Sequence, residues 1–199
     1  MNLLLVLSRF DPDNAERLRE PLRVAHAAIR LRTMFLLDSE IEAATEAFAV
    51  KFGDIARRRR ILFGVDPFAG LKPSRTATVT RLNQTLLNLV LRLRETYVTR
   101  GLREEQLAIA IAEAAGPLRA CAATLLELEG ATAASPKEAL ENIARTTLRQ
   151  DKQDSTKLLS LMSAAREEGR LEPGVAGPAV LAIIELAASM QARAKALMR

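Results

Sequence analysis

The sequence is poor in the residues that build metal clusters, disulfides and aromatic cores. Its 199 residues contain one cysteine, Cys121, one histidine, His26, and no tryptophan. One cysteine excludes an internal disulfide, and one histidine with one cysteine cannot form a His/Cys zinc cluster. A lone cysteine also suits a reducing compartment, so we expect a cytoplasmic protein.

Familiar catalytic and targeting motifs are absent as well. The sequence has no Gly-rich phosphate loop, no nucleophile elbow and no HExxH pattern, which excludes the familiar types of kinase and hydrolase. The apolar opening is too short for a signal peptide and lacks a basic leader, and no segment reaches the roughly twenty apolar residues of a membrane span. We therefore expect a soluble protein with no membrane partner.

What the sequence does contain favours helices. Apolar residues make up 49% of the chain while aromatic residues make up only 4%, so alanine and leucine supply most of the core. These residues have high helix propensity, which predicts a helix-rich protein with an aliphatic core. The formal net charge of +5 permits binding to phosphates or to an acidic surface, but the arginines are scattered, which is typical of solvated helix faces.

The first forty residues read as alternating strand and helix. The apolar run Leu3 to Leu7 predicts a strand buried on both faces. Asp11 and Pro12 are a typical helix start, and Pro21 is expected to bend or split that helix. Leu31 to Leu37 predicts a second strand.

The next segment reads as one helix and two short strands. A helix is expected to open near Ser39, which has capping-box spacing to Glu42, and to end near Phe48. Val50 to Ile55 and Ile61 to Phe63 predict two further strands on either side of an arginine run.

From Lys72 and Pro73 onward the apolar residues recur at helical spacing. Five helices are expected, the first with a stripe from Leu82 to Tyr97 and the second with a kink at Pro117. The sequence therefore predicts a mostly helical α+β fold: a small α/β segment in residues 1–72 and a helical bundle domain in residues 73–199.

Two stretches resemble a known family. Residues 48–55 (FAVKFGDI) and 60–68 (RILFGVDPF) resemble the back half of the catalytic domain in bacterial nucleotidyltransferase-domain proteins of the polymerase-β type. Leu86 to Tyr97, with its LRLRE sequence, is similar to the helical domain that follows in that family. The resemblance covers residue 2 to about residue 130 and implies a partial nucleotidyltransferase-like α/β segment.

The resemblance implies a magnesium site that this chain lacks in its usual form. In the family, a Gly-Ser turn holds the triphosphate and two carboxylates on one strand face hold Mg²⁺. The first strand here matches that metal strand, with Asn2 at the position of the second carboxylate and the first position before Met1. An amide oxygen brings no negative charge to Mg²⁺. We therefore expect no nucleotidyl transfer from this chain, and Mg²⁺ and a nucleoside triphosphate as cofactors only if the family activity is retained.

Two explanations for this departure stay open: a start assigned too late, or a degenerate copy that kept the scaffold and lost the chemistry. In the family layout Asp54 is the best remaining carboxylate for a third metal ligand or a base. The alternative is a structural aspartate that pairs with the neighbouring arginines. Arg57, Arg58 and Arg60 belong to a run of four arginines that could bind phosphate or RNA, because guanidinium groups match phosphate oxygens. The alternative is a set of solvated charges.

Three functional hypotheses follow. The first is a nucleotidyltransferase-like protein that is catalytically inactive or truncated. The second is a helical protein–protein interaction module, either a homo-oligomer or one half of a toxin-antitoxin-like pair. The helical ribonuclease type of such systems resembles an arginine followed closely by histidine, and no histidine follows His26. The third is a basic adaptor that binds RNA or phosphate, for which strongly salt-dependent binding is expected.

Overall fold

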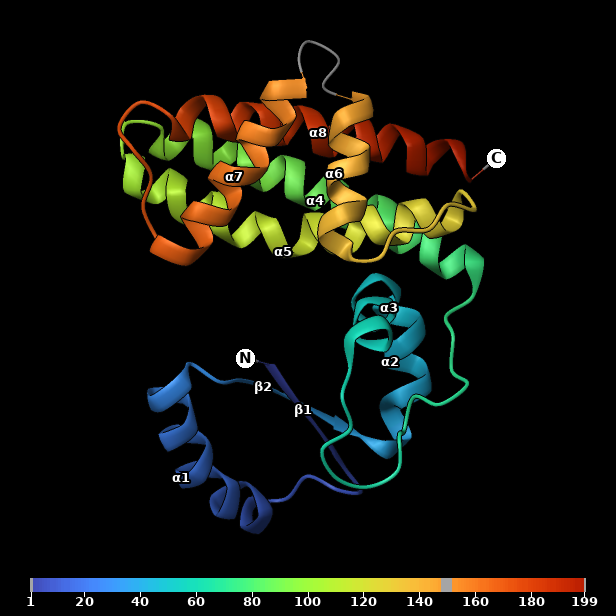
Figure 1. Ribbon diagram of the computed structural model, residues 1–199. Coiled ribbons are helices and arrows are strands. Elements are labelled where there is room, and N and C mark those ends of the chain that lie inside the picture. Colours follow the sequence, from blue (N-terminus) through green and yellow to red (C-terminus); the bar gives the residue numbers. More distant parts are fainter. Residues whose placement is uncertain (1, 148–151, 199) are drawn as a thin grey trace.

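The computed structural model describes residues 2–147 and 152–198. Most of the chain forms a helical bundle, and a smaller N-terminal layer of two strands and three α-helices lies against one side of it (Figure 1). The predicted fold class, mostly helical α+β, is confirmed.

The N-terminal layer begins with a strand–helix–strand unit. Strands β1 (Asn2–Leu7) and β2 (Arg32–Leu37) form a two-stranded parallel sheet, and α1 (Pro12–Ile29) connects them. The carboxylate of Asp11 accepts a hydrogen bond from the backbone N–H of Asn14 at 2.9 Å, which caps α1 as expected. The helix ends at Arg30, whose φ of 51° places it in the left-handed region.

The expected burial of β1 on both faces is wrong, and of the two outcomes expected at Pro21, a bend or a split, the split does not occur. The residues of β1 after Asn2 are only half-buried, because the described sheet has a single neighbour for this strand. Helix α1 is not split, since it continues through Pro21. Pro21 is exposed, and at an exposed position water can bond to the backbone carbonyl that a proline leaves without a donor.

Three short helices follow the sheet: the 3₁₀ helix η1 (Asp38–Glu40), α2 (Ile41–Ala47) and α3 (Ala49–Arg58). The helix predicted to end near Phe48 is confirmed, but its cap is different. The carboxylate of Glu40 accepts a hydrogen bond from the backbone N–H of Leu37 at 2.9 Å, instead of the expected pairing of Ser39 with Glu42.

The two predicted strands around the arginine run are wrong. Residues 50–55 belong to α3, which buries Ala49, Val50 and Phe52, and residues 61–63 are irregular and exposed. A short apolar run rich in β-branched and aromatic residues does not by itself distinguish a strand from a buried helix turn. Here the buried residues Ala49 and Phe52 are three positions apart, the spacing of one helix face, and their packing stabilises the helix.

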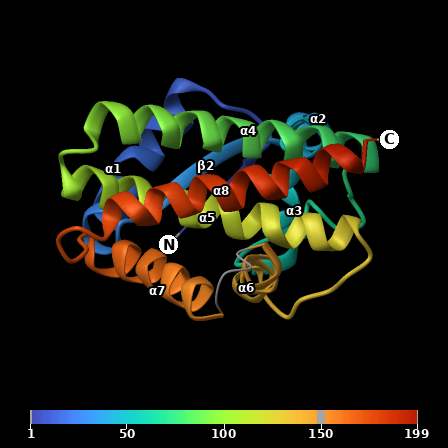
Figure 2. The ribbon, with the colours of Figure 1, turned by 90° about the horizontal axis from the view of Figure 1, so that it is seen from above.

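The bundle consists of α4 (Arg75–Arg100), α5 (Glu104–Leu128), α6 (Pro136–Thr147), α7 (Lys152–Glu168) and α8 (Ala176–Ala196). Helix α8 lies between α4 and α5 and contacts both, and α6 and α7 lie beyond α5 (Figure 2). The expected stripe on α4 is confirmed, with Leu82 and Leu86 fully buried. Helix α5 continues through Pro117.

Buried apolar side chains form two clusters. The large one fills the bundle, and the small one contains Leu36, Ile41, Phe52 and Phe68. Helix α3 contributes to both, because Val50 belongs to the bundle cluster and Phe52 to the small one. Helix α3 therefore joins the N-terminal layer to the bundle.

One helix departs from the expectation about membrane spans. Helix α5 is long and apolar enough to cross a membrane by length and composition, although half of its most apolar stretch is buried inside the bundle. A core helix of a bundle passes the same test, because its neighbours cover the apolar face that lipid would otherwise contact.

Candidate functional site

The predicted site residues on α3 lie in ion pairs. Asp54 and Arg58 are one helical turn apart, and Nε of Arg58 donates to Oδ1 of Asp54 at 3.0 Å while its guanidinium also pairs with Oδ2. The Asp54 side chain is only 15% exposed. Both of its carboxylate oxygens are thus held by an arginine, which is the structural alternative foreseen from the sequence.

Arg57 connects α3 to the bundle. Its Nη1 donates to Oε2 of Glu127 at 2.7 Å, and its Nη2 donates to Oγ1 of Thr124 at 3.3 Å, both on α5. Because the Glu127 side chain is 64% exposed, this ion pair contributes less than about 1 kcal/mol to stability. The contact mainly fixes the orientation of α3 on α5.

Arg59, which was not among the predicted site residues, holds the loop after α3. Its Nε donates to both carboxylate oxygens of Asp66 at 3.0 Å, and Asp66 also accepts from the backbone N–H of Phe68 at 3.0 Å. The hydrogen bond with Arg59 lowers the pKa of Asp66 below its ordinary value and raises the pKa of Arg59. This pair holds the turn that brings Phe68 into the small core.

The last arginine of the run stands apart. Arg60 is exposed and makes no ion pair within the described residues. Of the three residues predicted to bind phosphate, Arg57 and Arg58 are engaged by carboxylates and only Arg60 is free to meet a ligand.

Asn2, the predicted degenerate metal position, begins β1 and lies opposite Arg32 in the sheet register. It belongs to a different element from Asp54. Among residues 2–147 and 152–198, no group of three or more His, Cys, Asp or Glu side chains is placed to hold a metal ion.

Large apolar side chains are exposed in the N-terminal layer. Leu62, Phe63 and Val65, in the loop after α3, are 73%, 98% and 91% exposed. Phe10 is also exposed and makes an edge-on contact with Phe35 of β2, with ring centroids 5.9 Å apart. Exposed apolar side chains mark interaction sites where they form one contiguous patch.

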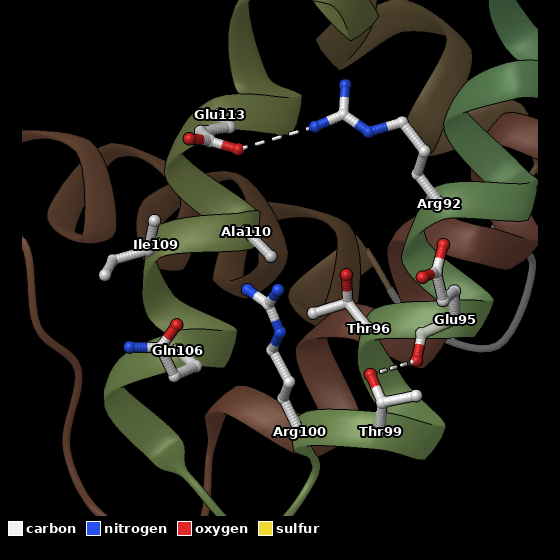
Figure 3. Close-up of a pocket in the computed structure, with 9 residues that line it drawn as sticks. All are labelled: Arg92, Glu95, Thr96, Thr99, Arg100, Gln106, Ile109, Ala110 and Glu113. Carbon is white, nitrogen blue, oxygen red and sulfur yellow. Dashed lines mark hydrogen bonds and ion pairs between the residues drawn. The ribbon is translucent and has the colours of Figure 1, made fainter.

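A cleft of about 210 Å³ lies between the end of α4 and the start of α5. Figure 3 shows Arg100 extending into it between Thr96 and Gln106, and Arg92 facing Glu113 across it at 3.7 Å. Its lining is mostly polar and contains two arginines and two glutamates, so its formal charge is balanced: Arg92, Glu95, Thr96, Thr99, Arg100, Gln106, Ile109, Ala110 and Glu113.

The cleft does not belong to the arginine run. Gln106 lines the cleft, and Thr124 contacts Arg57 of the arginine run. The two residues lie 18 positions apart on α5, which is roughly 27 Å along a helix. The cleft was not predicted from the sequence, because the residues that line it are typical of exposed helix faces. The signal that the sequence offers is the clustering of charged residues on both sides of Gly101.

One further cation lies between bundle helices. Arg119 on α5 is half-buried, its Nη2 donates to Oγ of Ser163 on α7 at 3.3 Å, and its Nε has no hydrogen-bond partner in the part of the chain that the structure describes. Burial lowers the pKa of Arg119, and the nearby charge of Arg166 lowers it further. The group is a polar contact inside the bundle.

Comparisons with protein-family models, with curated proteins and with solved structures find no match for this chain. Function is therefore inferred from the contacts, burial and charges described above.

Proposed function

We propose that this chain is a nucleotidyltransferase-like scaffold that works by associating with protein, first of all with a second copy of itself, and not by nucleotidyl transfer. The observation that carries the proposal is the open N-terminal layer: a two-stranded parallel sheet beside exposed apolar side chains.

The physical reason is that such a layer is incomplete by itself. Parallel sheets occur with both faces covered, and a two-stranded sheet is marginal unless further strands or helices support it. In this chain α1, which connects the strands, buries none of its residues. The exposed Phe63 and Val65 add apolar surface that a partner chain would remove from water.

The residues considered for catalysis support the same proposal. Asp54 is held by Arg58, and Arg57 is held by Glu127 and Thr124. A carboxylate already bound by a guanidinium would have to break that pair before it could ligate Mg²⁺ or accept a proton. The Asp54–Arg58 pair lies within α3, and Arg57 stabilises the join between α3 and α5.

Sedimentation velocity over a wide range of protein concentration tests the association. We expect an oligomer whose population grows with concentration. A protein that sediments as a monomer throughout that range would contradict the proposal.

Titration with ATP and Mg²⁺, with pyrophosphate as the assayed product, tests the catalytic part. We expect neither metal-dependent binding of ATP nor pyrophosphate release. Release of pyrophosphate that is lost in an Asp54→Asn variant would restore the enzyme hypothesis.

The RNA or phosphate adaptor is a second candidate, favoured by the free side chain of Arg60 and the net charge of +5. It predicts binding to single-stranded RNA that weakens steeply with salt. Arg60→Ala should then weaken RNA binding, while Arg94→Ala, which changes an exposed arginine on α4, should not. Equal loss in both variants would indicate unspecific attraction to the net charge.

A further inference from the structure

The two faces of the sheet have different surroundings. Even-numbered residues of both strands, Leu4, Val6, Met34 and Leu36, pack against the small core with Phe52 and Phe68. Successive strand residues point to opposite faces, so Leu3, Leu5 and Phe35 lie on the other face, where Phe35 is partly exposed. Register across the strands is fixed by this alternation.

The outer edge of β1 is unprotected. Within the described residues β1 pairs only with β2, so the N–H and C=O groups on its other side have no strand partner. Natural proteins protect such edges with charged residues, proline or bulges. The strand Asn2–Leu7 contains no charged residue and no proline.

The outer edge of β2 is protected in the expected way. Arg32 begins the strand and Arg30 precedes it, both exposed. Nζ of Lys51 lies 2.9 Å from Sδ of Met34, which brings a third cation to this strand. Charges of this kind oppose pairing of β2 with another chain.

We propose that two copies of this chain pair through their β1 edges, antiparallel about a two-fold axis, to form one sheet in the order β2-β1-β1-β2. This inference rests on the proposed function and names its interface. An open strand edge needs backbone donors and acceptors, which only another strand supplies along its whole length. The β1 strand of a second copy supplies them with no like charges opposite one another, and four strands exceed the three that a stable sheet needs.

The alternation of the strands limits the register. A two-fold axis perpendicular to the sheet keeps the small cores of both copies on one face, so odd-numbered residues lie opposite odd-numbered residues. The proposed dimer places Leu5, near the middle of β1, opposite Leu5 of the second copy.

Charge substitutions at Leu5 test the interface. Sedimentation velocity of Leu5→Lys and of Leu5→Glu should each show a dimer weakened by about tenfold or more, because like charges meet across the axis. An equimolar mixture of the two variants should recover the dimer, because opposite charges then meet. The matched control is Phe35→Lys, the register partner of Leu5 on β2, which should leave the dimer intact.

Thiol cross-linking gives an independent readout. Cys121 is buried, so in the Leu5→Cys variant the introduced thiol, and not Cys121, is accessible to an oxidant in solution. Under mild oxidation this variant should form a covalent dimer, while Val98→Cys, at an exposed position on α4, should not.

The outcomes separate this inference from the proposed function. An oligomer that persists in both Leu5 charge variants overturns the β1 interface and leaves association standing. An equimolar mixture of Leu5→Lys and Leu5→Glu that stays monomeric also overturns the β1 interface. Misfolding of the variants, and not charge repulsion, then explains the loss of the dimer. A wild-type protein that is monomeric at every concentration removes the proposed function itself.

Discussion

Truncation of one buried leucine in α4, compared with its exposed neighbour, measures how much the bundle depends on its core. Leu86 has no exposed surface, whereas Leu87 is 39% exposed and carries the same side chain one position later. Alanine at position 86 removes three buried carbon atoms and leaves a cavity in the apolar core of the bundle. Buried Leu→Ala changes cost about 3 to 5 kcal/mol in rigid cores, while exposed ones cost about 0.5 kcal/mol or less.

The assay is urea unfolding followed by circular dichroism at 222 nm. We expect Leu86→Ala to lower the free energy of unfolding by about 3 kcal/mol, a large fraction of the roughly 5 to 15 kcal/mol typical of a domain, and to lower Tm by about 6 to 12 °C. Leu87→Ala should stay close to the wild type. Equal losses in the two variants, or a loss below about 1 kcal/mol at position 86, would refute the assignment of this face of α4 to the core.

Three further predictions concern single side chains. Burial raises the pKa of Cys121 to about 12, so iodoacetamide at pH 8 should leave it unlabelled in the folded protein and label it in urea; labelling of the native protein would contradict its burial. The hydrogen bond from Arg59 lowers the pKa of Asp66. The stabilisation by this pair is therefore present above the pKa of Asp66 in the unfolded chain and is lost as pH falls through the lower pKa in the folded protein. NMR titration of the Asp66 carboxyl carbon should show the lowered pKa, and Arg59→Gln should return that pKa to its ordinary value. Ser135→Ala removes the cap of α6, where Oγ accepts from the backbone N–H of Glu138 at 3.1 Å, and should cost about 1 kcal/mol in urea unfolding while Ser135→Asp costs little.

The helical part of the chain was largely predictable, because its signals are local. Ser135 and Pro136 begin α6, Gly169 follows the last residue of α7, and the stripe through Leu82 and Leu86 is buried as expected. Caps depend on a few neighbouring backbone groups, and a stripe at helical spacing leaves one face to bury. Both are therefore visible in the sequence.

The segment after Phe48 was predicted wrongly, because its structure depends on distant residues. Val50 and Phe52 are compatible with a strand by composition, but one packs into the bundle core and the other into the small core from a helix. The sequence does not reveal that such neighbours are available. Tertiary packing overrides weak local preference in short apolar runs.

The candidate site shows the same division. The sequence by itself determined that Asp54 and the arginines from Arg57 to Arg60 lie close together, and that one alternative for Asp54 was an arginine pair. Only the tertiary structure decided which charge meets which: Arg57 reaches Glu127, 70 positions away, Arg59 meets Asp66, and Arg60 stays free. Caps and helical stripes are set within a few residues, whereas ion pairs between elements depend on where the whole chain places them.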